Sequence, residues 1–199
     1  AAKIVGVEKR ILIQHDIVQF KKAIRIVKKM FALKYATQVV AISETVKSFL
    51  IEYFEVKSEK INIIFNGINY EVFKKGRREV LNSSTSVVGI VGRLEKVKGH
   101  IYALKALKFL KEQHGLSPTI LLAGDGTLRS TLEKYTKENN LNSVKFLGNV
   151  NNIPDFLSQI DILVIPSINE GFGLVALEGM VSGKIVVASD VKVMRELIK

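Results

Sequence analysis

Short apolar runs alternate with longer amphipathic stretches along most of this chain. The runs are rich in valine and isoleucine and stop at glycine, proline or asparagine, which is typical of strands. The stretches between them carry apolar residues at helical spacing. This alternation predicts an α/β fold with parallel sheets. The expected strands cover residues 11–13, 38–42, 60–65, 87–91, 119–123, 144–147, 162–165 and 184–188. The expected helices cover residues 17–35, 45–54, 99–114, 127–138, 173–180 and 191–198.

Two details sharpen this pattern. Ser43 precedes the helix at 45–54 and is expected to cap it. The strands at 162–165 and 184–188 are continuous apolar runs and are expected to be fully buried.

A polar segment divides the chain. Residues 74–86, KKGRREVLNSSTS, have no apolar period and are expected to form a linker. We therefore expect a first domain at 1–73 and a second at 87–199.

Composition narrows the class of protein. With 199 residues and 47% hydrophobic content, the chain can bury a real core. No apolar run approaches the roughly 18 residues of a membrane-spanning helix, and no secretion signal is recognisable. The chain has no cysteine, which excludes disulfides and thiolate metal sites and fits a cytoplasmic protein.

The net charge of +11 is concentrated in the first part of the chain, where residues 1–85 hold 16 Lys+Arg against 8 Asp+Glu. The helix at 17–35 contains no acid and separates a basic from an apolar face. Such a helix can lie on an anionic membrane surface, or it can be an ordinary packed helix with a solvated charged face. The basic face holds Lys21, Lys22, Arg25, Lys28 and Lys29, and the apolar face holds Ile24, Val27 and Phe31.

The segment 161–190 carries the strongest candidate site. Gly171 and Gly173 flank Phe172 just where the helix at 173–180 begins. The free N–H groups of a first helical turn, together with the helix dipole, form a seat for an anion such as phosphate. Glu170 precedes this seat and Glu178 follows within the helix, where a carboxylate can accept hydrogen bonds from sugar hydroxyls. Alternatively, both are solvated surface acids.

Further candidates follow other expected strands. Arg93 and Lys98 flank a strand-to-helix connection and could together neutralise a diphosphate, or they are two surface cations of a basic protein. His15 follows the first strand, at the end where α/β sheets bind ligands, although a lone histidine is more often a structural residue. The Gly124–Gly126 turn is not a dinucleotide fingerprint, because Arg129 stands where the third glycine belongs.

Several of these segments together resemble one family. NEGFGLVALEGMVSGKIVVAS, VGRLEKVKGH and RILIQHD are similar to motifs of the family-four retaining glycosyltransferases of the GT-B fold. The resemblance implies two Rossmann-like parallel-sheet domains, the first only partly present. It also implies that the chain starts in the middle of the first domain and stops before the last strand and the final crossing helix, so that this stretch alone would bind donor poorly.

The resemblance implies a hexosyltransferase that moves a sugar from a UDP- or GDP-sugar to an acceptor hydroxyl with retention of anomeric configuration. Arg93 and Lys98 would hold the diphosphate, Glu178 the ribose, and Glu170 and His15 the donor sugar. The implied catalytic residues are Glu170, His15, Arg93 and Lys98. The implied donor-binding residues are Arg93, Lys98, Asn149, Val150, Glu170, Gly171, Phe172, Gly173, Leu174 and Glu178.

No metal and no cofactor are expected, because the chain has no Asp-x-Asp motif and paired cations can replace a divalent ion. The expected acceptor is a glycan or a lipid-linked molecule in surface polysaccharide or glycolipid synthesis, at the inner face of the membrane. Two alternatives remain at this point: a nucleotide-sugar epimerase of the same fold, and a non-catalytic basic module. Nucleic acid is not an expected partner, because no RNA-binding aromatic signature or helix-turn-helix pattern is present.

Overall fold

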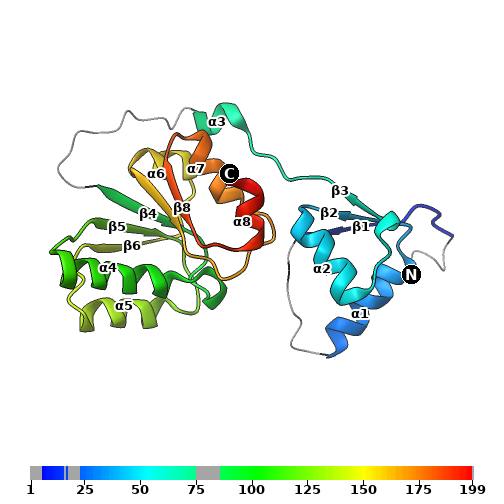
Figure 1. Ribbon diagram of the computed structural model, residues 1–199, viewed down its shortest axis with the longest axis horizontal. Coiled ribbons are helices and arrows are strands. Elements are labelled where there is room, and N and C mark those ends of the chain that lie inside the picture. Colours follow the sequence, from blue (N-terminus) through cyan, green and yellow to red (C-terminus); the bar gives the residue numbers. More distant parts are fainter. Residues whose placement is uncertain (1–5, 16, 18–22, 75–85, 199) are drawn as a thin grey trace. The chain divides into compact units, whose positions relative to one another are not determined.

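The protein divides into two compact units, shown in Figure 1. The computed structural model describes residues 6–15, 17, 23–74 and 86–198. Residues 75–85 of the predicted linker, and 18–22 of the predicted first helix, lie outside this description. Unit 1 comprises Ala1–Gly67, Glu170–Gly173 and Lys192–Lys199, and unit 2 comprises Ile68–Asn169 and Leu174–Val191.

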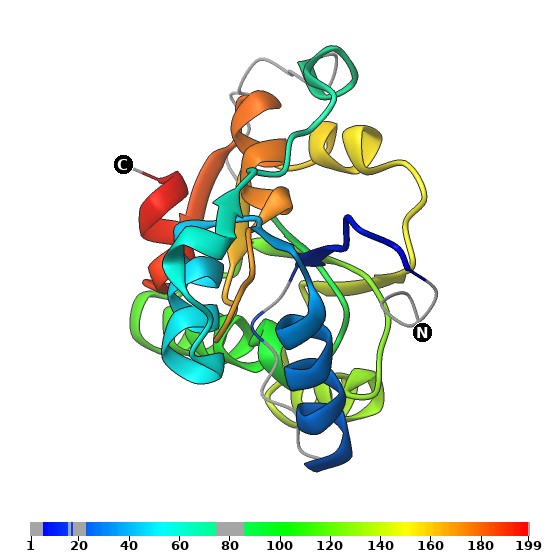
Figure 2. The same ribbon diagram turned by 90° about the vertical axis from the view of Figure 1, so that its right-hand side faces the viewer.

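Unit 1 is built on a three-stranded parallel sheet in the order β1-β2-β3. Helices α1 and α2 cover the same face of this sheet, as Figures 1 and 2 both show. Val39 and Ala41 of β2 are fully buried. Ile11 and Ile13 are in register with Gln38 and Val40, so they point to the opposite face of the sheet from Val39 and Ala41, and they are more than half exposed. The elements are β1 (Ile11–Gln14), α1 (Ala23–Tyr35), β2 (Gln38–Ala41), α2 (Glu44–Phe54), a 3-10 turn η1 (Ser58–Lys60), β3 (Ile61–Ile63) and α8 (Lys192–Leu197).

Two side chains accept hydrogen bonds from the free N–H groups at the N-terminus of α2. Ser43 caps it as predicted, because its Oγ accepts a hydrogen bond from the Val46 N–H at 3.0 Å. The carboxylate of Glu196, on α8, accepts bonds from the N–H groups of Glu44 at 3.1 Å and Thr45 at 2.8 Å. A negative charge at this end of a helix also stabilises the helix dipole.

Unit 2 is built on a five-stranded parallel sheet in the order β6-β5-β4-β7-β8. Helices α4 and α5 lie on one face and α6 and α7 on the other (Figure 1), as right-handed crossovers require. The strands are β4 (Val87–Val91), β5 (Thr119–Ala123), β6 (Val144–Gly148), β7 (Ile162–Ile165) and β8 (Ile185–Ala188). The helical elements are α3 (Tyr70–Lys74), a 3-10 turn η2 (Lys96–Lys98), α4 (His100–His114), α5 (Arg129–Glu138), α6 (Ile153–Ser158) and α7 (Leu174–Val181).

Two short helices, α3 and α6, were not predicted. Each spans less than two turns, so neither shows a full helical period in the sequence. The start of α6 does have a local signal, because Asn152 accepts a hydrogen bond from the Asp155 N–H at 3.1 Å and a proline occupies the first turn.

The prediction that both strands of the 161–190 segment are fully buried was wrong for one of them. β7 lies inside the sheet, and its Leu163 and Ile165 are buried. β8 is an edge strand, and its Ile185 and Val187 are 61% and 51% exposed. An apolar run therefore identified the strand but not its position in the sheet.

One buried cluster of unit 2 lies between the sheet and the α4–α5 layer. Ile90 and Leu122 contribute from central strands, and Leu104 and Leu132 contribute from the two helices. Its burial stabilises the unit at about 25 cal/mol per Å² of apolar area removed from water. The buried cluster is Ile90, Leu94, Leu104, Leu107, Ile120, Leu122, Leu132 and Leu141.

His100, the first residue of α4, is buried without a polar partner. Its side chain is 2% exposed, and within the described part of the chain neither ring nitrogen has a hydrogen-bond partner. Burial, and secondarily the charge of the neighbouring Lys98, lowers the pKa of His100 to about 4. The folded protein therefore holds this imidazole neutral at pH 7.

This burial predicts a pH-dependent stability. The unfolded chain binds a proton at His100 below its ordinary pKa of 6.5, whereas the folded chain binds one only near 4. The free energy of unfolding should therefore fall by about 3 kcal/mol between pH 6.5 and pH 4 from this residue alone. Urea unfolding across that range should show this fall in the wild type and a flatter curve in His100→Leu. Gln113→Leu, an exposed change on the same helix that removes no titrating group, is the control and should keep the wild-type fall.

Candidate functional site at the carboxyl edge of the sheet

The loops that follow the central strands of unit 2 are joined to one another by their backbones. They meet at the carboxyl edge of a parallel sheet, where α/β folds bind ligands. The loop after β4 is bonded to the loops after β5 and β7, and the β5 loop is bonded to β6. These bonds run from Gly92 N–H to Ala123 O at 2.9 Å, Leu94 N–H to Asp125 O at 2.9 Å, Gly124 N–H to Gly148 O at 2.7 Å and Ile168 N–H to Val97 O at 2.8 Å.

Gly124 is required for this joining. Its φ is +142°, a conformation that side chains with a Cβ rarely adopt, and a Cβ at this position would overlap the carbonyl oxygen of Gly92. The loops after β4 and β5 can therefore approach one another only because this residue lacks a side chain.

A cavity of about 200 Å³ lies among these loops. It brings together three residues that the sequence proposed for the donor site: Arg93 after β4, and Asn149 and Val150 after β6. This volume is below that of a typical whole-ligand site, so the cavity suits one part of a larger ligand. Its lining residues are Val91, Gly92, Arg93, Ala123, Gly124, Asp125, Asn149, Val150 and Ile153.

Asp125 lines the same cavity and was not among the predicted site residues, because its turn was interpreted as architectural. One carboxylate oxygen accepts a bond from the Gly126 N–H at 2.7 Å. The other forms a 3.1 Å ion pair with Arg129, which also pairs with Glu133 at 2.9 Å. Its place directly after a buried strand was the signal that could have identified it.

Lys98 lies on the same connection between β4 and α4 as Arg93. The aliphatic stem of Lys98 packs against Gly92, within 4 Å of where a Cβ would be. The residue after it, Gly99, has a φ of +66° and lies directly against the carbonyl of Pro166, at the end of β7. Arg93 and Lys98 are thus both held at the junction of β4 and β7, where the strand order of the sheet reverses.

Glu178 is half-buried on α7 of unit 2. Burial raises the pKa of its carboxyl group above the ordinary value. A desolvated carboxylate is stabilised by hydrogen-bond donors from a ligand, which makes Glu178 a candidate for contact with hydroxyl groups.

The loop that carries the other predicted glutamate belongs to unit 1. The Ser43 hydroxyl, which is fully buried, donates a hydrogen bond of 2.8 Å to the carbonyl of Gly171. Phe172 is 5% exposed, and its ring centroid lies 6.3 Å from that of Phe65. Gly173 has a φ of +93° directly before α7 begins. The side chain that caps α2 therefore also holds this loop.

The predicted site residues consequently divide between the two units. His15, which is exposed directly after β1, and Glu170–Gly173 belong to unit 1. The other predicted residues, Arg93, Lys98, Asn149, Val150, Leu174 and Glu178, belong to unit 2.

Two searches of the described residues complete the description. Residues 6–15, 17, 23–74 and 86–198 contain no group of three or more His, Cys, Asp or Glu side chains arranged to hold a metal ion. Over the same residues, no helix has both the length and the apolar character that crossing a membrane requires.

Comparison with protein families gives a match over most of the chain. The model of the family described as "Glycosyl transferases group 1" matches residues 72–199. The putative glycosyltransferase EpsF of Bacillus subtilis is 30% identical over 206 aligned residues, which cover 96% of this chain and 53% of that protein. The Escherichia coli UDP-Gal:alpha-D-GlcNAc-diphosphoundecaprenol alpha-1,3-galactosyltransferase is 30% identical over 194 aligned residues, covering 90% and 50%.

Comparison with solved structures gives a match over the whole chain. The Anabaena protein HepE, crystallised with UDP and glucose, is similar with a TM-score of 0.84 and 26% identity. The likeness covers 100% of this chain and 57% of that one. This chain thus spans about half the length of the curated relatives that it matches.

The joined loops generate a testable prediction. Gly124→Ala should lower the free energy of unfolding by about 3 kcal/mol or more, because the added methyl group combines an unfavourable φ with overlap of the Gly92 carbonyl. Hydrogen exchange should also speed up at the Leu94 amide, whose bond to Asp125 depends on this loop.

Gly115→Ala is the matched control. This glycine also has a positive φ, +67°, but nothing lies within 4 Å of an added Cβ. It should cost only about 1 kcal/mol and leave exchange at Leu94 unchanged. Equal costs for the two variants would show that the contact between the loops does not matter.

Proposed function

The chain belongs to the glycosyl transferases group 1 family, and we propose that it transfers a sugar from a nucleoside-diphosphate sugar to an acceptor hydroxyl. Its two parallel sheets, with helices between successive strands, are the Rossmann-like sheets of the GT-B fold. We propose further that the reaction retains the anomeric configuration and serves the synthesis of a surface polysaccharide or glycolipid.

The observation that carries this proposal is the cavity at the carboxyl edge of unit 2. Arg93, Asn149 and Val150 line it together, and Lys98 follows Arg93 on the same connection between β4 and α4. Arg93 and Lys98 follow β4, beside the strand-order reversal between β4 and β7, which is the place where open α/β sheets bind nucleotides. The cavity extends from Arg93 past the ends of β5 and β6.

The two cations are proposed to bind the diphosphate. When the bond between the anomeric carbon and the diphosphate oxygen breaks, negative charge grows on the leaving group. The acceptor oxygen forms the new bond and gives its proton to the departing diphosphate. Arg93 offers a planar fork of donors, and Lys98 offers a point charge. Donors of both kinds stabilise this charge as it forms.

The remaining predicted residues are proposed to hold the rest of the donor. Glu178 accepts hydrogen bonds from the ribose hydroxyls, which suits its partly desolvated carboxylate. Asn149 and Val150 contact the base. Glu170 and His15 position the donor sugar, and the N–H groups around Phe172–Leu174 bind a phosphate oxygen.

We propose uracil as the base. Two similar proteins support this choice: HepE was crystallised with UDP, and the Escherichia coli relative is named for UDP-galactose. That relative's name also includes a diphosphoundecaprenol acceptor, and a lipid-linked acceptor is accordingly proposed for this chain.

A membrane-bound acceptor accords with the surface of α1. The side chains of Val27 and Phe31, on the predicted apolar face, are 49% and 54% exposed, so this face is not covered by a packed core. Lys28 and Lys34 are exposed on the same helix. We propose that α1 lies against an anionic membrane surface, which both kinds of side chain favour.

Donor binding is tested by calorimetry with UDP, GDP and their sugar conjugates. UDP should bind more tightly than GDP, and Arg93→Ala and Glu178→Ala should each weaken UDP binding about 10-fold to 100-fold, because each removes a charge-assisted hydrogen bond. Lys137→Ala and Glu138→Ala remove exposed charges of the same signs from α5 and should leave the affinity unchanged. Equal weakening by all four variants would mean that only the overall charge matters and would contradict the donor site.

Metal independence is tested separately. Arg93 and Lys98 are proposed to provide the positive charge that a divalent ion would supply, so the UDP affinity measured with EDTA should agree within about twofold with that measured with magnesium. Binding that appears only when a divalent cation is added would overturn this part of the mechanism.

A further inference from the structure

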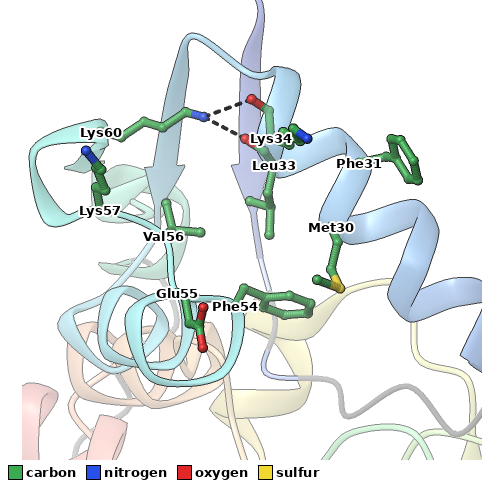
Figure 3. Close-up of a pocket in the computed structure, with 9 residues that line it drawn as sticks. All are labelled: Met30, Phe31, Leu33, Lys34, Phe54, Glu55, Val56, Lys57 and Lys60. Carbon is green, nitrogen blue, oxygen red and sulfur yellow. Dashed lines mark hydrogen bonds between the residues drawn. The ribbon is translucent and has the colours of Figure 1, made fainter.

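Unit 1 contains a second cavity, of about 540 Å³, which the proposed transfer reaction does not use. It lies between the C-terminal ends of α1 and α2 and the turn η1, as Figure 3 shows. This volume is within the range of sites for small organic ligands. The lining residues are Met30, Phe31, Leu33, Lys34, Phe54, Glu55, Val56, Lys57 and Lys60.

The cavity lies at the opposite end of the sheet from the predicted site residues of unit 1. Helix α1 leads into the start of β2, and η1 leads directly into the start of β3, so the cavity is at the amino edge. His15 and Ser43 follow the carboxyl ends of β1 and β2. A molecule in this cavity would therefore not occupy the place of a ligand bound beside His15.

The interior of the cavity is apolar. Leu33 and Val56 form its buried floor, at 4% and 8% exposed. The side chains of Met30 and Phe54 extend toward one another beside them (Figure 3). Met30 is 54% exposed, so the apolar wall continues from the floor to the protein surface. A hydrocarbon chain entering here would lose contact with water along its length.

The rim of the cavity is basic. Three lysines line it against a single carboxylate, that of Glu55. The Lys60 ammonium is bonded to the carbonyl of Leu33 at 2.6 Å and so completes the end of α1 (Figure 3). Lys34 and Lys57 are exposed, on either side of the apolar floor. An anionic group attached to the hydrocarbon would therefore meet positive charge at the entrance.

We propose that this cavity takes one acyl chain of an anionic phospholipid from the membrane surface, while Lys34 and Lys57 bind the lipid phosphate. The inference rests on the proposed contact of α1 with a membrane, and it deepens that proposal by naming the lipid and the place of its chain. The apolar floor selects for the chain, and the basic rim selects for the anionic head group. A soluble phosphate would gain nothing from Leu33, Val56 and Met30.

Chain insertion can be measured directly because the protein contains no tryptophan. Phe54→Trp places one reporter in the cavity wall, and Phe109→Trp places one on α4 of unit 2, at a phenylalanine that is 58% exposed. Vesicles of phosphatidylglycerol and phosphatidylcholine with brominated acyl chains should quench the first reporter and not the second. Equal quenching of both, or quenching of neither, would overturn the proposal.

Variants then separate the cavity from general surface charge in vesicle cosedimentation. The double variant Lys34→Gln/Lys57→Gln should lose about 25-fold in affinity, since each lysine near an anionic surface contributes about fivefold. Val56→Phe keeps every charge but fills the floor, and should lose at least about tenfold because the acyl chain is excluded. Val187→Phe, on the exposed edge of unit 2, and Lys105→Gln/Lys137→Gln are the matched controls and should bind as the wild type does.

These measurements separate binding in the cavity from binding at the surface. If Val56→Phe binds vesicles with wild-type affinity, lipid binds only at the surface, and the proposal that the cavity takes an acyl chain is wrong. If Val56→Phe does not fold by its melting curve, Met30→Ser, at a half-exposed position, tests the same wall. If inorganic phosphate displaces the protein from the vesicles and the brominated acyl chains do not quench the reporter at position 54, the ligand is a soluble anion instead. The UDP affinity of the same variants, measured by calorimetry, should equal that of the wild type. A failure of the lipid proposal is therefore distinguishable from a failure of the proposed donor site.

Discussion

The backbone hydrogen bonds between the loops at the carboxyl edge of unit 2 are the constraint on which the candidate site depends. Parallel strands bring several loops to one edge, but they do not by themselves set how those loops lie. Here Gly92, Leu94 and Gly124 donate to neighbouring loops, and Ile168 joins the loop after β7 to the same group. The bonds are possible because Gly124 leaves room for the Gly92 carbonyl. Arg93 is thereby held in place by backbone geometry.

Positive charge in this protein is divided between places with different chemistry. At the carboxyl edge of unit 2, Arg93 and Lys98 are held on one loop, next to a histidine that burial keeps neutral. At the amino edge of unit 1, lysines surround an apolar cavity. The first arrangement suits a small, highly charged group, because both cations follow the same strand. The second suits an amphiphile, because charge surrounds hydrocarbon. The net charge of +11 alone does not distinguish these two uses.

Local chemistry predicted most elements well. The strands at 87–91, 119–123 and 162–165 were predicted with the bounds that the structure shows, because buried parallel strands read as continuous apolar runs. Ser43 was recognised as a cap from its position before a helical period. Short elements without a full period, α3 and α6, were missed. The exposure of β8 was also missed, because an edge strand and an inner strand share the same composition.

The sequence by itself determined the fold class and the types of residue in the candidate site, since strand runs, helix starts and the motifs around Arg93 and Glu178 are local. Only the tertiary structure decided what those residues meet. It placed Arg93, Asn149 and Val150 around one cavity, added Asp125 to them, and tied the Gly171 loop to Ser43. It also formed the apolar cavity of unit 1 from the ends of two helices. Such contacts join residues far apart in the chain, and their distances depend on packing that no local pattern encodes.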